Sequence, residues 1–143
     1  MRRCEMVDVR EAFPRCQMQG WGRVTGRPSY DEIIESFGAE IVVDVTDDNY
    51  QGYSRYMLRD GDRFGFLIVG WGSCSGCDAL QACDTHEELQ ELVDQLERDI
   101  HWEDSAADML TYVNSKDWET ERGGYKREQT ERFIDAAREA LQS

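Results

Sequence analysis

The spacing of hydrophobic residues changes several times along the chain, and each change predicts a new element. The first clear pattern begins at Ser29, which has the capping-box spacing to Glu32 and precedes the apolar pair Ile33 and Ile34. This pattern predicts a short helix. A run of β-branched residues follows over residues 41–46 and predicts a buried strand, because such side chains pack well on a pleated sheet.

The segment over residues 53–72 contains two extended runs separated by Asp60 and Gly61. An Asp-Gly pair tolerates the positive φ angles of a tight turn, so the two runs are expected to form an antiparallel hairpin. Together with the strand over residues 41–46, the hairpin makes a three-stranded meander. Its second run is expected to pack against helices.

A helical pattern begins at Thr85, where the apolar residues change to offsets of three and four. Thr85 and Glu88 again have the capping-box spacing, which makes this long helix the clearest element in the sequence. Asp104 or Ser105 can cap a shorter helix, and a pair of glycines separates that helix from a last one. Residues 29–143 are therefore predicted to have the order α-β-β-β-α-α-α.

These elements predict an α+β protein, with a small antiparallel three-stranded meander packed with about four helices. The first 28 residues contain both prolines and no sustained hydrophobic period, so residues 1–28 are predicted to form an irregular N-terminal arm. The length of 143 residues suits one hydrophobic core and is short for two. Residues 1–143 are therefore expected to form a single domain.

The amino-acid composition indicates which kinds of molecule the protein can bind. Hydrophobic residues make up 40% of the chain, which argues against disorder. Thirty acidic residues against 16 basic ones give a net charge of −14, which opposes direct binding to nucleic acid or to anionic lipid. The N-terminus lacks the apolar stretch of a secretion signal, and no run is long enough for a membrane span. We therefore expect a cytoplasmic protein whose partner is a protein with a basic surface.

Most of the negative charge lies in one third of the chain. Residues 78–121 contain 14 acidic and 2 basic residues, a charge of −12, whereas residues 1–77 contain 12 and 9. On the long helix, Glu87, Glu91 and Asp94 are the candidate partner-binding residues. Such a surface can imitate phosphates and occupy the basic groove of a nucleic-acid-binding protein. The alternative is an ordinary solvated helix face that keeps the protein in solution.

Trp21 is a further candidate for partner binding, because it stands between Gly20 and Gly22 in the predicted arm. Large aromatic side chains are frequent anchors at protein interfaces. Core packing is the more common fate of such residues, and it is expected for the other three tryptophans.

A cluster of cysteines gives the chain its most distinctive segment. Cys74 and Cys77 have the two-residue gap that lets one turn present both sulfurs to a metal ion. Cys83 and His86 follow and can complete a tetrahedral zinc site. The gap of five residues between Cys77 and Cys83 is shorter than the gap of about twelve that separates ligand pairs in common zinc motifs.

Two other interpretations of this segment remain open. The cysteines can be small buried residues at a turn from a strand to a helix. Alternatively, a Cys-x-x-Cys before a helix has the local layout of a thiol redox site. No proline follows the motif, however, as it does in thioredoxin-like domains, because Pro14 and Pro28 both precede it.

Several short motifs resemble those of small uncharacterised proteins of bacteriophages and bacteria. They are Arg59-Asp60-Gly61-Asp62, Phe64-Gly65-Phe66, Gly72-Ser73-Cys74-Ser75-Gly76-Cys77-Asp78 and Leu80, which together are 15 of the 143 residues. The resemblance implies an intracellular protein, in the host cytoplasm if a phage encodes it. It implies no activity, ligand or catalytic residue.

The sequence therefore favours a non-enzymatic acidic binding protein, such as a phage-type inhibitor or modulator of a basic host protein that binds nucleic acid. The alternative is a small cysteine-dependent redox protein or enzyme centred on Cys74 and Cys77. No catalytic residue is assigned, zinc is the one candidate cofactor, and the oligomeric state is open.

Overall fold

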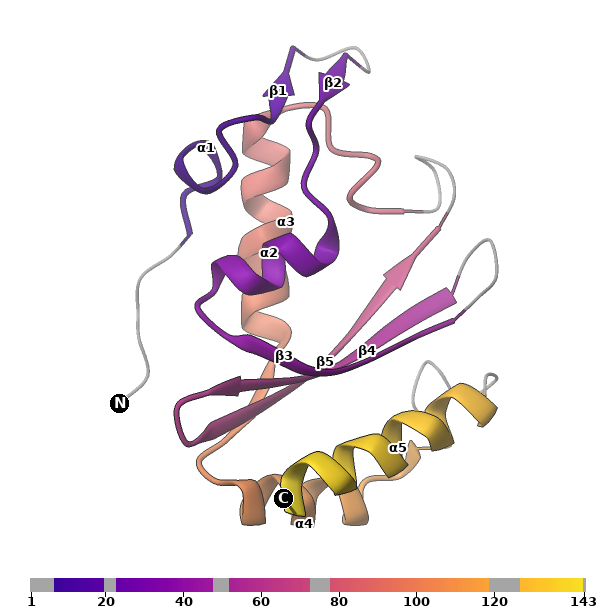
Figure 1. Ribbon diagram of the computed structural model, residues 1–143. Coiled ribbons are helices and arrows are strands. Elements are labelled where there is room, and N and C mark those ends of the chain that lie inside the picture. Colours follow the sequence, from indigo (N-terminus) through magenta and orange to yellow (C-terminus); the bar gives the residue numbers. More distant parts are fainter. Residues whose placement is uncertain (1–6, 20–22, 48–51, 73–77, 119–126, 143) are drawn as a thin grey trace.

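The computed structural model describes residues 7–19, 23–47, 52–72, 78–118 and 127–142 (Figure 1). Its central feature is an antiparallel sheet of four strands in the order β3-β4-β5-β6. These strands are β3 (Glu40–Thr46), β4 (Gly52–Asp60), β5 (Arg63–Trp71) and β6 (His101–Glu103).

Helices cover both faces of this sheet (Figure 1). One layer holds α1 (Val9–Ala12), α2 (Tyr30–Ser36) and α3 (His86–Asp99), and the other holds α4 (Ala106–Ser115) and α5 (Arg127–Gln142). Each layer encloses its own cluster of buried hydrophobic side chains against the sheet. Among the described helices, none combines the length and the apolar character that crossing a membrane requires. The predicted α+β class is confirmed.

Strand β4 contributes to both cores because successive side chains of a strand point to opposite faces. Tyr56 and Leu58 belong to the core under α2 and α3, whereas Met57 belongs to the core under α4 and α5. Strand β5 alternates in the same way, with Leu67 in the first core and Phe66 in the second. The sheet therefore joins two separate hydrophobic layers.

Three predicted helix starts are confirmed by their caps. Ser29 Oγ accepts a hydrogen bond of 3.1 Å from the Glu32 N–H, and the Ser29 N–H donates to Glu32 Oε1 at 2.8 Å. Thr85 caps α3 through a 3.1 Å bond from the Glu88 N–H. Ser105 caps α4 in the same way. Each cap satisfies an N–H group that the first turn of a helix leaves without a partner.

Two glycines allow neighbouring strands of the sheet to turn and to pair. Gly61 has φ of +65° in the turn between β4 and β5, which confirms the hairpin predicted there. Gly65 pairs with Trp102 of β6, and a Cβ atom on Gly65 would lie 2.7 Å from Ile100 Cγ2. The absence of a side chain at this position lets β6 approach β5.

The predicted three-stranded meander is present as β3-β4-β5, but the predicted numbers of strands and helices do not match exactly. Strand β6 adds a fourth strand, and the described residues form five helices. Residues 101–103 are too few to show an alternating pattern, and they follow directly on a helix that ends at Asp99. Helix α1 has four residues, which is too short for a helical period to appear.

The segment over residues 1–28, expected to be irregular, contributes to the first core where it is described. Besides α1, it contains a two-stranded antiparallel sheet of β1 (Gln17–Met18) and β2 (Val24–Thr25). Val9 and Cys16 are 2% and 3% exposed and lie in the core under α2 and α3.

Candidate functional site

The acidic residues singled out in the sequence lie on α3, beside the N-terminal segment. Glu87 and Glu91 are exposed, whereas Asp94 is half-buried. Glu87 Oε2 lies 3.8 Å from Arg10 Nη2 in a solvent-exposed ion pair. Asp94 Oδ1 accepts a 2.9 Å hydrogen bond from Gln90 Nε2. Two of the three predicted contact residues are thus already engaged within the chain.

Gln90 attaches the N-terminal segment to α3. Its Nε2 donates to the carbonyl oxygen of Val7 at 2.6 Å, and its Oε1 accepts from the N–H of Val9 at 3.1 Å. One side-chain amide therefore pairs with the main chain on both sides of Asp8. We call this pair of bonds the Gln90 clamp. Sequence reasoning missed it, because a glutamine on a polar helix face gives no signal of a distant main-chain partner.

Other acidic residues of this region remain exposed. They make no hydrogen bond through their carboxylates and no ion pair with another described residue. Glu91 and Asp99 are on α3, Asp104 precedes α4, and Asp108 is in the first turn of α4. Their charges are available to a partner.

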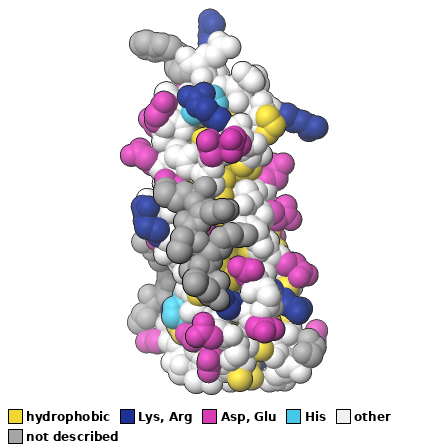
Figure 2. Space-filling view, turned by 90° about the vertical axis from the view of Figure 1, so that its left-hand side faces the viewer, with side chains coloured by type: hydrophobic (Ala, Val, Ile, Leu, Met, Phe, Trp, Pro, Cys, Tyr) yellow, Lys and Arg dark blue, Asp and Glu magenta, His cyan; other side chains and the backbone are white. Residues whose placement is uncertain are grey.

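The acidic side chains do not form one continuous patch on the face shown in Figure 2. Asp and Glu side chains are spread over the height of this face, with Lys and Arg side chains between them (Figure 2). A partner that recognises negative charge would therefore meet mixed charges on this side. A more local feature would add specificity.

One such feature is a groove beside β5. Strand β6 pairs with β5 only at Phe64–Phe66, so within the described chain the rest of β5 has a strand on one side only. A pocket of about 380 Å³ lies at this point. We call it the β5 groove; it is lined by Ile68, Gln95, Asp99, His101, Tyr112 and Lys116, among others.

An aromatic wall forms one side of the β5 groove. The rings of His101 and Tyr112 stack with 3.9 Å between centroids and 15° between planes. His101 Nε2 also donates to Glu103 Oε2, which fixes the orientation of the ring. Lys116 Nζ lies 5.3 Å from the centroid of the Tyr112 ring, within the range of a cation–π contact. The groove thus combines flat apolar surface with the charges of Asp99 and Lys116.

The structure describes two of the four zinc-ligand candidates, Cys83 and His86, and each makes a hydrogen bond to a different main-chain carbonyl group. Cys83 is buried, and its Sγ lies 3.3 Å from the carbonyl oxygen of Ala79. Burial, reinforced by the nearby Glu88 carboxylate, raises the pKa of the Cys83 thiol to about 11. His86 Nε2 donates to the carbonyl oxygen of Cys16 at 3.3 Å.

The other two candidates, Cys74 and Cys77, lie outside the described residues, as does Trp21. Within the part of the chain that the structure describes, no three His, Cys, Asp or Glu side chains are arranged to hold one metal ion. The four-ligand zinc site stays a prediction.

Gly72 and Asp78 are the described residues on either side of the cysteine pair, and the Asp78 side chain binds the Gly72 main chain. Its Oδ2 accepts from the N–H of Gly72 at 2.9 Å, and its Oδ1 accepts from the N–H of Leu80 at 2.9 Å and the O–H of Tyr30 at 2.8 Å. Gln81 Nε2 also donates to the Gly72 carbonyl oxygen at 2.8 Å. We call this arrangement the Gly72–Asp78 stem. Burial, together with the Asp78 carboxylate, raises the pKa of Tyr30.

The signal for this role was present in the sequence. An aspartate whose carboxylate binds the N–H two residues later forms an Asx turn, a common way to start a turn. The bond of Asp78 to the Gly72 N–H, across the cysteine pair, has no such local signal.

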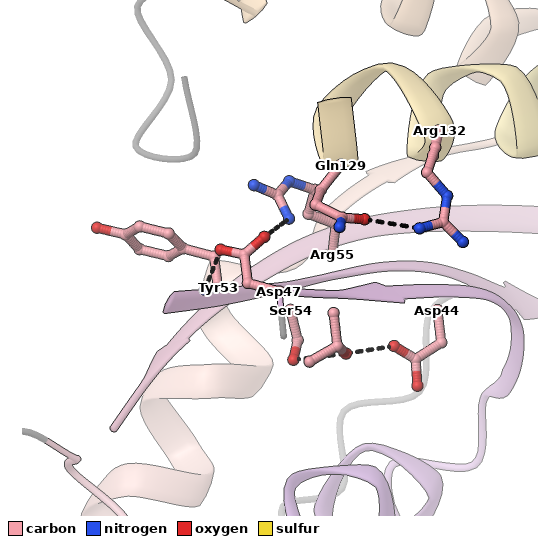
Figure 3. Close-up of polar contacts among 8 residues, drawn as sticks. Asp44, Asp47, Tyr53, Ser54, Arg55, Gln129 and Arg132 are labelled. Atoms are coloured by element: carbon pink, nitrogen blue, oxygen red, sulfur yellow. Dashed lines mark hydrogen bonds and ion pairs between the residues drawn. The ribbon is translucent and has the colours of Figure 1, made fainter. Parts of the chain in front are cut away.

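A buried ion pair lies where β3 ends and β4 begins (Figure 3). Arg55 Nη1 and Asp47 Oδ1 are 3.0 Å apart, and the two side chains are 1% and 0% exposed. Asp47 Oδ2 also accepts from the N–H of Tyr53 at 2.9 Å. Figure 3 shows this pair on the α5 side of the sheet, with the bonds of Asp44 and Ser54 on the other side. Sequence reasoning missed the pair, although an arginine within an apolar strand requires a partner.

Comparison with known proteins assigns no family. No protein-family model, curated protein or solved structure matches this chain.

Proposed function

We propose that this chain is a non-enzymatic binding protein whose partner is a protein with a basic surface. The observation that carries the proposal is the set of exposed acidic side chains on α3 and at the start of α4 that have no ion pair with another described residue. Its members are Glu91, Asp99, Asp104 and Asp108. They belong to the segment over residues 78–121, whose charge is −12.

Several features support a protein partner over other ligands. A net charge of −14 repels phosphate backbones and anionic lipid headgroups. Negative charge attracts a basic surface over several ångströms and speeds the association of the two proteins. A cytoplasmic inhibitor or modulator of a nucleic-acid-binding protein is the specific form that we propose, in keeping with the resemblance to phage proteins.

Because some acidic residues of α3 contact other parts of the chain, we assign the partner-binding surface to residues nearer the C-terminal end of this helix. Glu87 and Asp94 lie beside the Gln90 clamp, so their carboxylates also serve the N-terminal segment. Glu91 keeps the role that the sequence suggested for it. Asp99 and Asp104 extend the surface toward β6.

The test compares two charge-matched variants as baits in a nuclease-treated cell lysate. The surface variant combines Glu91→Gln, Asp99→Gln and Asp104→Gln. The control combines Glu35→Gln, Glu131→Gln and Glu139→Gln, three exposed acids on α2 and α5. The wild type and the control should retain a basic partner at low salt and release it at high salt, because screening weakens exposed charge contacts. Equal capture by both variants would remove this surface from the proposal.

The second candidate function is a cysteine-dependent redox protein or enzyme centred on Cys74 and Cys77. The Gly72–Asp78 stem favours it, because it holds together the described residues on either side of the cysteine pair. Elemental analysis of the purified protein, combined with thiol titration, separates the alternatives. Zinc that is lost with Cys74→Ser and with Cys83→Ser indicates the four-ligand site. A metal-free protein with a low-pKa thiol that Cys77→Ser removes indicates redox chemistry.

A further inference from the structure

Strand β5 extends beyond its outer neighbour. Its register with β6 covers Phe64, Gly65 and Phe66, while its register with β4 continues to Trp71. The chain coming from α3 reaches this edge at Ile100, directly before β6. Within the described residues, Leu67–Trp71 is therefore an open sheet edge.

Exposure along this open edge alternates. Leu67 and Val69 are buried, at 2% and 3%, whereas Ile68 is half-buried and Gly70 is exposed. Since glycine has no side chain, exposure of Gly70 is exposure of its main chain. Every second residue of a strand points its N–H and C=O groups to the same edge. In a hairpin with a two-residue turn, the closing pair, here Asp60 and Arg63, exchanges its main-chain hydrogen bonds. The register continues without a shift, so Leu67, Val69 and Trp71 point their main-chain groups to β4, and Ile68 and Gly70 point theirs to the open edge.

The β5 groove lies along the same stretch. Gln95 and Asp99 of α3 form one wall, and His101 and Tyr112 form the other. Ile68 belongs both to the open edge and to the lining of the groove. An extended peptide that paired with the edge would therefore place side chains between the acidic end of α3 and the aromatic wall.

The charges beside the open edge of β5 favour one kind of binding partner over another. Asp99 is exposed in the groove, while the ammonium group of Lys116 lies over the Tyr112, Phe66 and Trp118 rings. A second copy of this chain would bring another charge of −14 to the same place. An extended segment with lysine or arginine side chains would instead be attracted.

From these observations we infer that the partner binds by adding an extended basic segment, as a further strand, to the Leu67–Trp71 edge of β5. Main-chain hydrogen bonds to Ile68 and Gly70 hold the segment, and Asp99 attracts its basic side chain. This inference rests on the proposed function, because it takes the partner to be basic, and it names where and how that partner binds.

The main-chain part of the inference is tested with a short peptide that alternates valine and lysine. Its control has the same sequence with N-methyl groups on consecutive central residues, which keeps the charge and removes the N–H donors. The unmodified peptide should bind at least about tenfold more tightly than the control, because lost strand hydrogen bonds have no replacement at the edge. Hydrogen exchange at the Ile68 and Gly70 amides should slow when the unmodified peptide binds.

The charge part of the inference is tested with Asp99→Lys. This residue is exposed at the C-terminal end of α3, where a positive charge suits the helix dipole, so the variant should fold. It should bind the peptide about fivefold more weakly at low salt, because it repels the lysine side chains. The matched control is Glu35→Lys on α2, which makes the same change of charge away from the groove and should bind as the wild type does.

The possible failures can be told apart. Equal affinity for both peptides would overturn strand addition and leave an electrostatic surface, so the proposed function would stand alone. Slowed exchange with a valine–threonine peptide, in a protein that captures no basic partner, would support the edge and overturn the proposed function. A concentration-dependent dimer whose formation slows the same two amides would assign the edge to a second copy and overturn the inference.

Discussion

At the scale of single residues, the Arg55–Asp47 pair places two opposite charges inside the protein. Both side chains are withdrawn from water, so the Asp47 carboxylate depends on the Arg55 cation for its stabilisation. Asp47 also satisfies the N–H of Tyr53, and a Cβ on Gly52 would lie 2.6 Å from Asp47 Oδ2. The pair thus fixes the ends of β3 and β4 beneath α5.

Removing one partner of this pair should strongly destabilise the fold. We expect Arg55→Met to lower the free energy of unfolding by about 3–5 kcal/mol, because it leaves the Asp47 carboxylate buried without its cation. The measurement is equilibrium unfolding in urea. The double variant Arg55→Met with Asp47→Leu should recover part of the loss. A loss under about 1 kcal/mol for the single variant would mean that water reaches Asp47.

Cys83 should make stability depend on alkaline pH. Its thiol ionises near 9.0 when unfolded, whereas burial raises the pKa to about 11 in the folded protein. Between these values the unfolded chain loses the proton first, so stability should fall as the pH rises from 9.0 to about 11. Unfolding measured across this range should show a shallower decline for Cys83→Ala. Parallel curves for the two proteins throughout the range would contradict the raised pKa.

At the scale of elements, the N-terminal segment depends on the Gln90 clamp. Replacing Gln90 by alanine removes both bonds and leaves the Val9 N–H without its acceptor. Cleavage by trypsin after Arg10 should become about tenfold faster, because local opening costs less free energy. Gln95→Ala, an exposed position on the same helix, is the control and should leave the rate unchanged. Equal rates for the two variants would show that burial of Val9 alone holds the segment.

Elements were predictable from the sequence where local rules determine them. Ser29, Thr85 and Ser105 cap the helices that their spacing predicted, and Gly61 makes the expected turn. Strand β6 was missed because its pairing depends on Gly65, which lies far away in the sequence.

The candidate site was less predictable than the fold. The sequence showed which region is acidic, but the exposure of Glu91 and the engagement of Glu87 depend on where α1 packs. The open edge of β5 follows from the relative lengths of β5 and β6, which no residue pattern records. Tertiary contacts therefore decide the parts of the site that sequence spacing left open.

At the scale of the whole molecule, charge opposes compactness. The net charge is −14, and the acidic side chains repel one another more strongly in the folded state, where they are closer together. Salt at about 0.1 M screens charges beyond about 10 Å, so it should relieve this repulsion.

The melting temperature should therefore rise by a few degrees when sodium chloride is added at neutral pH. The variant with Glu91→Gln, Asp99→Gln and Asp104→Gln has a charge of −11 instead of −14, so its rise should be smaller. Scanning calorimetry at several salt concentrations measures both. A melting temperature that falls with salt in the wild type would mean that attractive ion pairs outweigh the repulsion.

The Gly72–Asp78 stem has a consequence for protein engineering. Since Asp78 and Gln81 bind both polar groups of the Gly72 main chain, we expect the fold on either side to tolerate additional residues between Gly72 and Asp78. The entropy of closing a loop grows slowly, by about 0.6 kcal/mol for each doubling of its length. A foreign peptide inserted between the two ends of the stem would be displayed on a scaffold that keeps its own two cores.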